Sequence, residues 1–318
     1  MTQPGIEIIG SYIPEDRLQL DDLGEKFDAK PDFVKRKIGF SQLARKKTDQ
    51  QCSDLCVAAF QQIADKVSFD LDDLDCLAVV TQNPDSGAIP HAAALVHQKL
   101  WAPETAACFD ISLGCTGYVH GLSILKGFMQ ENGMERGLLF TSDPYSTIID
   151  PDDRDTAMLF GDAATCTVLS TSPRYSIGKT SFATESRLSH AIQTDSWGGH
   201  LSMDGNLVFR SVSLTVPRLV NKNLKQNELT LDEIDLCLVH QGSKFIVDTV
   251  RSLLRLPEEK VPFLASETGN TVSSSIPLML QETMAETNPP EKILLAGFGV
   301  GLSAAATVIT RIDSRISS

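Results

Sequence analysis

The chain has 318 residues, 42% of them hydrophobic, and a formal net charge of −13 at pH 7. This length allows one large or two ordinary globular domains with substantial cores. The acidic balance argues against nonspecific binding of nucleic acid, and the lack of a long uncharged apolar stretch argues against a membrane span.

The seven cysteines predict a reducing compartment rather than a disulfide framework. They form no Cys-x-x-Cys pair and no Cys/His spacing typical of a metal site, so we expect no bound metal. The count is odd and the chain opens without a signal peptide, which favours the cytoplasm.

Near the N-terminus, an otherwise acidic chain carries a local group of basic side chains. Such a group is either a solvated face or a docking site for an acidic partner or a phosphate. Its members are Lys35, Arg36, Lys37, Arg45, Lys46 and Lys47.

Cys115 lies between a predicted buried strand and a predicted buried helix over Tyr118–Met129. Gly114 and Gly117 bracket the thiol and allow the chain to turn sharply there. The free N–H groups at the start of a helix favour thiolate over thiol, which predicts a nucleophile. A small buried core cysteine is the alternative.

Three segments of the first half recur, in the same order, in the second half. Each half is predicted to interleave strands with helices, with buried strands at Cys76–Thr81, Gly137–Ser142 and Lys292–Ala296. We therefore predict an α/β fold made of two related halves, residues 1–170 and 171–318. The matching pairs are Leu71–Gln82 with Leu231–Gln241, Phe109–Leu122 with Phe263–Leu278, and Gly161–Leu169 with Gly301–Ile309.

The duplication predicts which polar side chains meet. Cys115 and Asn270 occupy equivalent turns, and His240 ends the strand equivalent to the one that ends at Thr81. Equivalent loops of two related halves meet at their pseudo-twofold axis, so a thiol, an imidazole and an amide are expected together. Taken singly, His240 could be a core histidine and Asn270 a turn residue.

Seven segments in this order resemble ketoacyl-acyl carrier protein synthase III, a condensing enzyme of the thiolase superfamily. The resemblance covers almost the whole chain and implies a thiolase-like five-layered αβαβα fold, usually as a homodimer. The segments are Phe33–Gly39, Asp110–Gly121, Asp153–Arg154 with Phe160–Ala163, Met203–Phe209, His240–Gln241, Gly269–Thr271 and Gly297–Gly301.

The resemblance also implies the chemistry. Cys115 takes an acyl group from a thioester, and the N–H groups of Cys115 and Val300 form the oxyanion hole. A malonyl-type thioester then loses CO₂, and its enolate is stabilised by His240 and Asn270 before it attacks the acyl group. The substrates are acyl-CoA or a phosphopantetheinyl thioester on an acyl carrier protein, and no cofactor is needed.

Several positions depart from the family and bear on the substrate. Phe33 and Lys37 stand where members that use acyl-CoA carry Trp and Arg, and Ser243 and Phe245 replace Asn and Arg, while Arg154 is retained. A carrier protein is therefore favoured as acyl donor. The resemblance adds Gly205 and Phe209 to the substrate site and Arg210 and Lys244 to carrier-protein docking.

Ile89 matches the residue that reaches across the family's dimer to close the primer pocket, where an aromatic side chain would restrict the acyl group to acetyl. Isoleucine leaves moderate room, which predicts longer primers. Three other functions stay open: acyl transfer to an O or N acceptor without decarboxylation, a non-catalytic partner subunit, and a papain-like cysteine protease. The duplication and the lack of a Cys-Trp dipeptide argue against the protease.

Overall fold

The computed structural model describes residues 3–64, 69–196 and 198–312. Its main sheet begins with five strands in the order β5-β4-β6-β7-β1. Neighbours β4 and β6 run parallel, whereas β7 runs antiparallel to both β6 and β1. These strands span Gly5–Tyr12 (β1), Cys76–Val80 (β4), Ala107–Ile111 (β5), Arg136–Ser142 (β6) and Ala164–Ser170 (β7).

The second half of the sheet repeats this pattern. Strands β12 and β13 are parallel, β14 is antiparallel to β13, and β8 and β9 are antiparallel to β14. From β4 onward, the first half has the same sequence of parallel and antiparallel pairs as the second half from β12 onward, which confirms the internal duplication, while β5 has no counterpart among the described strands. The strands are β8 (Tyr175–Ile177), β9 (Ser181–Thr184), β12 (Leu236–Val239), β13 (Lys292–Gly299) and β14 (Ser303–Arg311).

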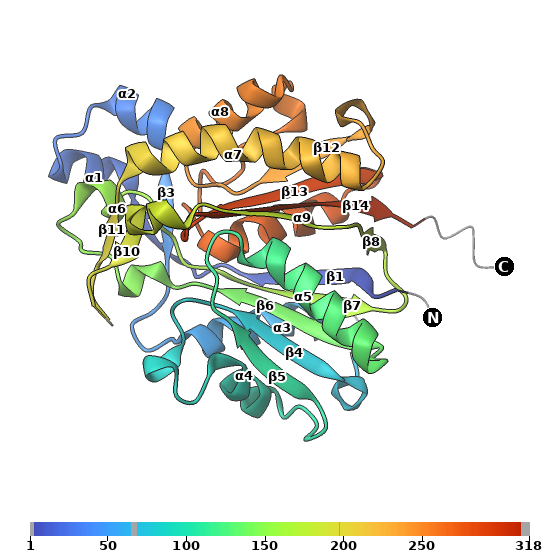
Figure 1. Ribbon diagram of the computed structural model, residues 1–318. Helices are drawn as coiled ribbons and strands as arrows, with labels where there is room; N and C mark the ends of the chain where they lie inside the picture. The colour runs from blue at the N-terminus through green and yellow to red at the C-terminus, as the bar shows by residue number, and fades with distance from the viewer. Residues whose placement is uncertain (1–2, 65–68, 197, 313–318) are drawn as a thin grey trace.

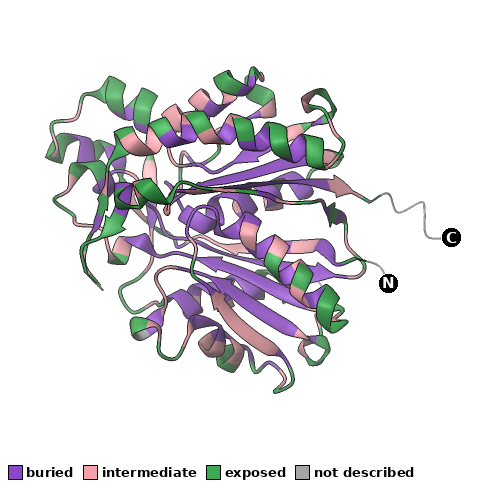
Figure 2. Cartoon of the chain, in the orientation of Figure 1, coloured by how far each residue is buried: buried purple, intermediate pink, exposed green. Residues whose placement is uncertain are grey.

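Helices cover the two half-sheets on both faces, which gives the predicted five layers (Figure 1). Between the half-sheets lie α5 (Gly117–Asn132) and α9 (Ser275–Met284), which share one apolar core with strands of both halves. The outer layers are α3 (Cys52–Ala64) with α4 (Ala92–Leu100), and α7 (Gly205–Gln226) with α8 (Lys244–Leu254). Figure 2 shows buried strands between helices whose outward sides are exposed.

The predicted elements around the site are confirmed. A strand precedes Cys115, and the helix after it begins at Gly117, one residue before the predicted start. The strand predicted to end at Ala296 continues to Gly299, which brings the glycine-rich segment into the sheet. The predicted boundary at residues 170 and 171 falls between β7 and β8.

Shorter elements gather at the end of the fold where the loops of the two halves meet (Figure 1). They are β2 (Asp16–Gln19), α1 (Leu20–Lys26), α2 (Pro31–Phe33), a π-helical turn (Val34–Ile38), β3 (Gln42–Arg45), α6 (Arg154–Ala157), β10 (Ile192–Thr194) and β11 (Leu201–Met203). Short 3₁₀ turns cover Leu71–Asp73, Asp85–Ala88, Tyr145–Thr147, Ser186–Ala191, Leu231–Glu233, Glu258–Lys260 and Val272–Ser274. Within the described residues, no helix combines the length and apolarity that crossing a membrane requires.

Candidate active site

Cys115 lies in the turn between β5 and α5, just before the helix cap at Thr116. Its side chain is 8% exposed and faces Gly299 at the end of β13. A Cβ atom on Gly299 would lie 2.8 Å from Sγ of Cys115, closer than van der Waals contact permits. Only glycine at position 299 leaves room for the Cys115 thiol where the two halves come together.

Burial, together with the nearby Asp143 carboxylate, raises the pKa of the Cys115 thiol to about 12. The backbone N–H groups of Cys115 and Val300 hydrogen-bond to the sulfur and oppose this rise. The prediction that the helix N-terminus favours thiolate is therefore wrong. The free-energy cost of removing a charged sulfur from water is larger than the stabilisation that the N–H groups give to the thiolate.

His240 follows β12, where its backbone N–H donates to the carbonyl of Ala296 at 2.9 Å. The imidazole is buried, and its Nδ1 lies 2.8 Å from Oγ of Ser275. Burial lowers the pKa of His240 to about 3. The ring is therefore neutral near pH 7, as a hydrogen-bond donor to an enolate must be.

Asn270 follows Gly269, whose φ of 77° gives the turn its left-handed backbone. The N–H of Val272 donates to Oδ1 of Asn270 at 2.9 Å. This bond assigns the amide oxygen to the backbone and leaves Nδ2 free to donate into the cavity. Val272 itself has a φ of 52°, a rare conformation for a β-branched residue and one that concentrates at functional sites.

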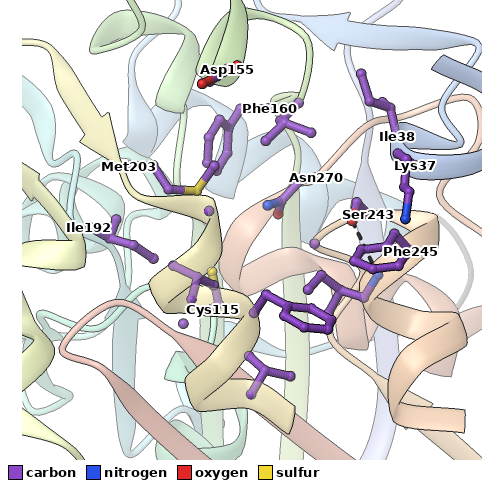
Figure 3. A pocket seen from close by; sticks show the side chains of 18 of the residues that line it. Lys37, Ile38, Cys115, Asp155, Phe160, Ile192, Met203, Ser243, Phe245 and Asn270 are labelled. Atoms are coloured by element: carbon purple, nitrogen blue, oxygen red, sulfur yellow. Dashed lines mark hydrogen bonds between the residues drawn. The ribbon is translucent and has the colours of Figure 1, made fainter. Parts of the chain in front are cut away.

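A cavity of about 610 Å³ brings the predicted residues together. Cys115, His240, Asn270 and Val300 all line it, although they come from four different segments of the chain. In Figure 3, Asn270 lies between Cys115 on one side and Ser243 and Phe245 on the other. The arrangement offers a nucleophile, neutral hydrogen-bond donors and an apolar wall, which suits acyl-group chemistry.

Val300, whose N–H is an expected oxyanion donor, has a backbone conformation that suits its branched side chain. It is not among the residues with positive φ, so its side chain causes no backbone strain. Its Cγ1 would lie 3.1 Å from a Cβ on Gly114, which places the valine side chain directly beside the nucleophile turn.

All the predicted substrate residues except Ile89 line the same cavity. Aromatic and basic side chains among them contact one another. Lys37 places Nζ over the Phe245 ring, 3.4 Å from its centroid, and Phe245 stacks on Phe209 with centroids 5.1 Å apart. Arg154 lies over Phe33 at 5.9 Å and pairs with Asp155 at 3.0 Å. These cations are thus already engaged by aromatic faces or a carboxylate. The substrate residues in the wall are Phe33, Lys37, Arg154, Gly205, Phe209, Ser243 and Phe245.

Three predicted residues lie outside the cavity wall. Ile89 is 88% exposed on the loop before α4, so nothing in this single chain brings it to the pocket. Arg210 is exposed on α7, one residue beyond Phe209. Lys244 pairs with Asp248 at 3.3 Å and lies 5.7 Å from the centre of the Phe263 ring.

The site contains a polar group that the sequence analysis missed. Asp143 is fully buried after β6 and accepts hydrogen bonds from the N–H of Gln82, at 2.7 Å, and from the hydroxyl of Ser273. Tyr145, in the cavity wall, donates to Oε1 of Gln82 at 2.8 Å. The signal in the sequence is the charged Asp143 directly after a buried strand, because Cys115 and His240 also follow strands.

The remaining polar groups of the described residues give no sign of a metal centre. Within residues 3–64, 69–196 and 198–312, no group of three or more His, Cys, Asp or Glu side chains is arranged to hold a metal ion.

Comparison with known proteins agrees with this architecture. Residues 109–186 match the family model for 3-oxoacyl-[acyl-carrier-protein] synthase III, and residues 224–311 match the model for its C-terminal part. The β-ketoacyl-[acyl-carrier-protein] synthase III of Alkalilimnicola ehrlichii is 28% identical over 313 residues, covering 94% of this chain and 97% of that protein.

Solved structures give the same result. A crystal structure of 3-oxoacyl-(acyl-carrier-protein) synthase III superposes with a TM-score of 0.90 at 28% identity, covering 97% of this chain and 99% of that one. The priming β-ketosynthase of the R1128 polyketide biosynthetic pathway gives a TM-score of 0.87 at 25% identity, covering 98% and 99%.

Fold and site together define a condensing enzyme of the thiolase superfamily. More narrowly, the chain belongs to the 3-oxoacyl-acyl carrier protein synthase III family, as the matches in both of its halves show. It is therefore an acyltransferase with a condensing function of the synthase III type.

Proposed function

We propose that the chain catalyses decarboxylative condensation, with Cys115 as nucleophile and His240 and Asn270 as donors to the enolate. One observation carries the proposal: a thiol, a neutral imidazole and an amide from separate elements border the same cavity. Acyl transfer to an O or N acceptor would need the thiol but not the other two donors. Their presence therefore favours condensation over simple acyl transfer.

In the first step, Sγ of Cys115 attacks the carbonyl carbon of an acyl thioester. The new sulfur–carbon bond forms, the donor's carbon–sulfur bond breaks, and the thiol proton leaves with the released thiol. The N–H groups of Cys115 and Val300 stabilise the oxyanion, a role supported by their hydrogen bonds to the sulfur.

In the second step, a malonyl-type thioester occupies the cavity beside the acylated cysteine. The bond to its carboxylate breaks, CO₂ leaves, and the electron pair forms an enolate that accepts hydrogen bonds from His240 and Asn270. The enolate carbon then attacks the acyl carbonyl and a carbon–carbon bond forms. The bond between the acyl carbon and Sγ breaks, and Cys115 leaves as a thiolate that takes a proton from solvent. None of these steps requires a metal or a cofactor.

The cavity rim supports a carrier protein rather than CoA as acyl donor. CoA brings several phosphate charges, whereas Lys37 and Arg154 are already engaged by Phe245 and by Asp155. Lys37 also lacks the fork with which arginine holds a phosphate. Arg210 and Lys244, near the start of α7 and of α8, are the proposed contacts for an acidic carrier protein.

The chain is also proposed to act as a homodimer. Strand β5 ends the path of the main sheet, and its other edge pairs with no described strand. A free strand edge readily pairs with another chain. Dimerisation along β5 would cover the exposed Ile89 and is expected to bring it to the partner's primer pocket.

Intact-protein mass spectrometry tests the proposed function. Wild type and Cys115→Ala are incubated with matched acyl-CoA and acyl-carrier-protein thioesters, followed by malonyl-carrier protein. We expect an acyl adduct on wild type alone, faster loading from the carrier protein, and loss of the adduct with release of CO₂. Loading without CO₂ release would favour acyl transfer, and no loading from any donor would overturn Cys115 as the nucleophile.

A further inference from the structure

The hydroxyl of Ser275 is the side-chain partner of the His240 imidazole. Its Oγ lies 2.8 Å from Nδ1, and both residues are buried. Ser275 is the first residue of α9, so a helix end holds its hydroxyl beside the ring. The two nitrogens of a neutral imidazole share one proton, so the partner of Nδ1 decides what Nε2 can do.

The surrounding hydrogen bonds indicate the direction of this contact. The other acceptor for the Ser275 hydroxyl is the carbonyl of Val272, at the longer distance of 3.2 Å. That carbonyl already accepts the backbone N–H of Ser275. We therefore assign the Ser275 hydroxyl as the donor to Nδ1 of His240. As the acceptor of this bond, Nδ1 carries no proton.

We propose that Ser275 is a positioning residue that holds His240 in the tautomer protonated on Nε2. This inference rests on the proposed condensation. Only a protonated Nε2 can donate to the enolate oxygen that forms when CO₂ leaves, and the proton stays on His240 throughout. Acyl loading uses the N–H groups of Cys115 and Val300 instead, so the tautomer should matter for decarboxylation and not for loading.

One turn therefore orients both enolate donors. The N–H of Val272 fixes the amide of Asn270, and three residues later the hydroxyl of Ser275 fixes the imidazole of His240. In Ser275→Ala the ring loses the hydroxyl as a donor. The backbone carbonyl of Val272, which also hydrogen-bonds with the imidazole, remains beside the ring as an acceptor. The imidazole proton is then expected to move to Nδ1, which turns a bare Nε2 lone pair toward the enolate.

The test compares Ser275→Ala with Ser274→Ala. Ser274 belongs to the same turn and is equally buried, but it bonds to Thr141 at 2.8 Å and does not contact His240. For each variant, acyl loading from an acyl-carrier protein and CO₂ release from malonyl-carrier protein are measured separately. We expect Ser275→Ala to lose about 10- to 100-fold in CO₂ release, less than removal of a whole donor, with loading within about twofold of wild type. Ser274→Ala should leave the ratio of the two rates unchanged.

Two further measurements complete the test. Nitrogen NMR of histidine-labelled protein should show Nε2 protonated in wild type and Nδ1 protonated in Ser275→Ala, and Ser275→Thr should restore much of the CO₂ release. Equal losses of loading and CO₂ release in Ser275→Ala, or a wild-type ring protonated on Nδ1, would overturn the inference. If wild type releases no CO₂, the proposed function fails, and NMR still reports whether Ser275 sets the tautomer.

Discussion

Replacing Asp143 by asparagine should remove a pH-dependent loss of stability. Burial raises the pKa of Asp143 to about 6, from 3.8 for an exposed carboxyl, so the folded chain holds this proton more tightly than the unfolded chain. The protonated carboxyl makes its full contribution to the free energy of unfolding below about pH 4, and this contribution is lost as the pH rises through about 6. At 1.36 kcal/mol per pKa unit, an ionised Asp143 costs about 3 kcal/mol at pH 7.5 and about half of that at pH 5.

Urea unfolding of wild type and Asp143→Asn at several pH values measures this difference. Asparagine keeps an oxygen that can accept from Gln82 or Ser273, but it carries no charge. The stability of the variant relative to wild type should rise by about 1.5 kcal/mol between pH 5 and pH 7.5. Alkylation of Cys115 should also become faster, because the Asp143 carboxylate helps to raise the thiol pKa. Parallel stability curves and unchanged alkylation would refute the reasoning.

Three further predictions concern the cavity. Gly299→Ala should slow acyl loading at least about 100-fold, because its Cβ would lie 2.8 Å from Sγ of Cys115, whereas Gly127→Ala, with no atom within 4 Å of its Cβ, should load normally. Phe245→Arg should raise kcat/KM for acyl-CoA relative to acyl-pantetheine about tenfold, through a charge-assisted bond to phosphate; an unchanged ratio contradicts this. Ile89→Phe should shorten the preferred acyl chain in a profile of matched thioesters, and an unaltered profile would remove Ile89 from the primer pocket.

The three central residues could be predicted because the duplication carries spatial information. Strand ends of related halves meet at one axis, so equivalent positions in the sequence become neighbours in space. Cys115, His240 and Asn270 each follow a strand or begin a turn, and the cavity unites them. Local pattern also sufficed for β4 and β6, which are continuous apolar runs, and for α5, an apolar segment that begins at Gly117 and is capped by Gly133.

Other features depend on the assembled fold. The thiol pKa is set by burial, and a sequence shows the helix N-terminus but not how completely water is excluded around Cys115. The contact of Lys37 with Phe245 joins segments far apart in the chain, and no periodicity encodes it. In the sequence Asp143 is one polar residue among many, because its hydrogen bonds to Gln82 and Ser273 form only in the folded chain. The proposed role of Ile89 would depend on a second chain.

The most direct test of the central claim follows one acyl group on the enzyme. Acyl-loaded wild type, freed of donor, is mixed with malonyl-carrier protein, and both the mass of the Cys115 peptide and the released CO₂ are followed. The account predicts that the acyl mass disappears as one CO₂ is released per acyl group, with a 3-oxoacyl product on the carrier. Persistence of the adduct, or its loss without CO₂, would contradict condensation at Cys115.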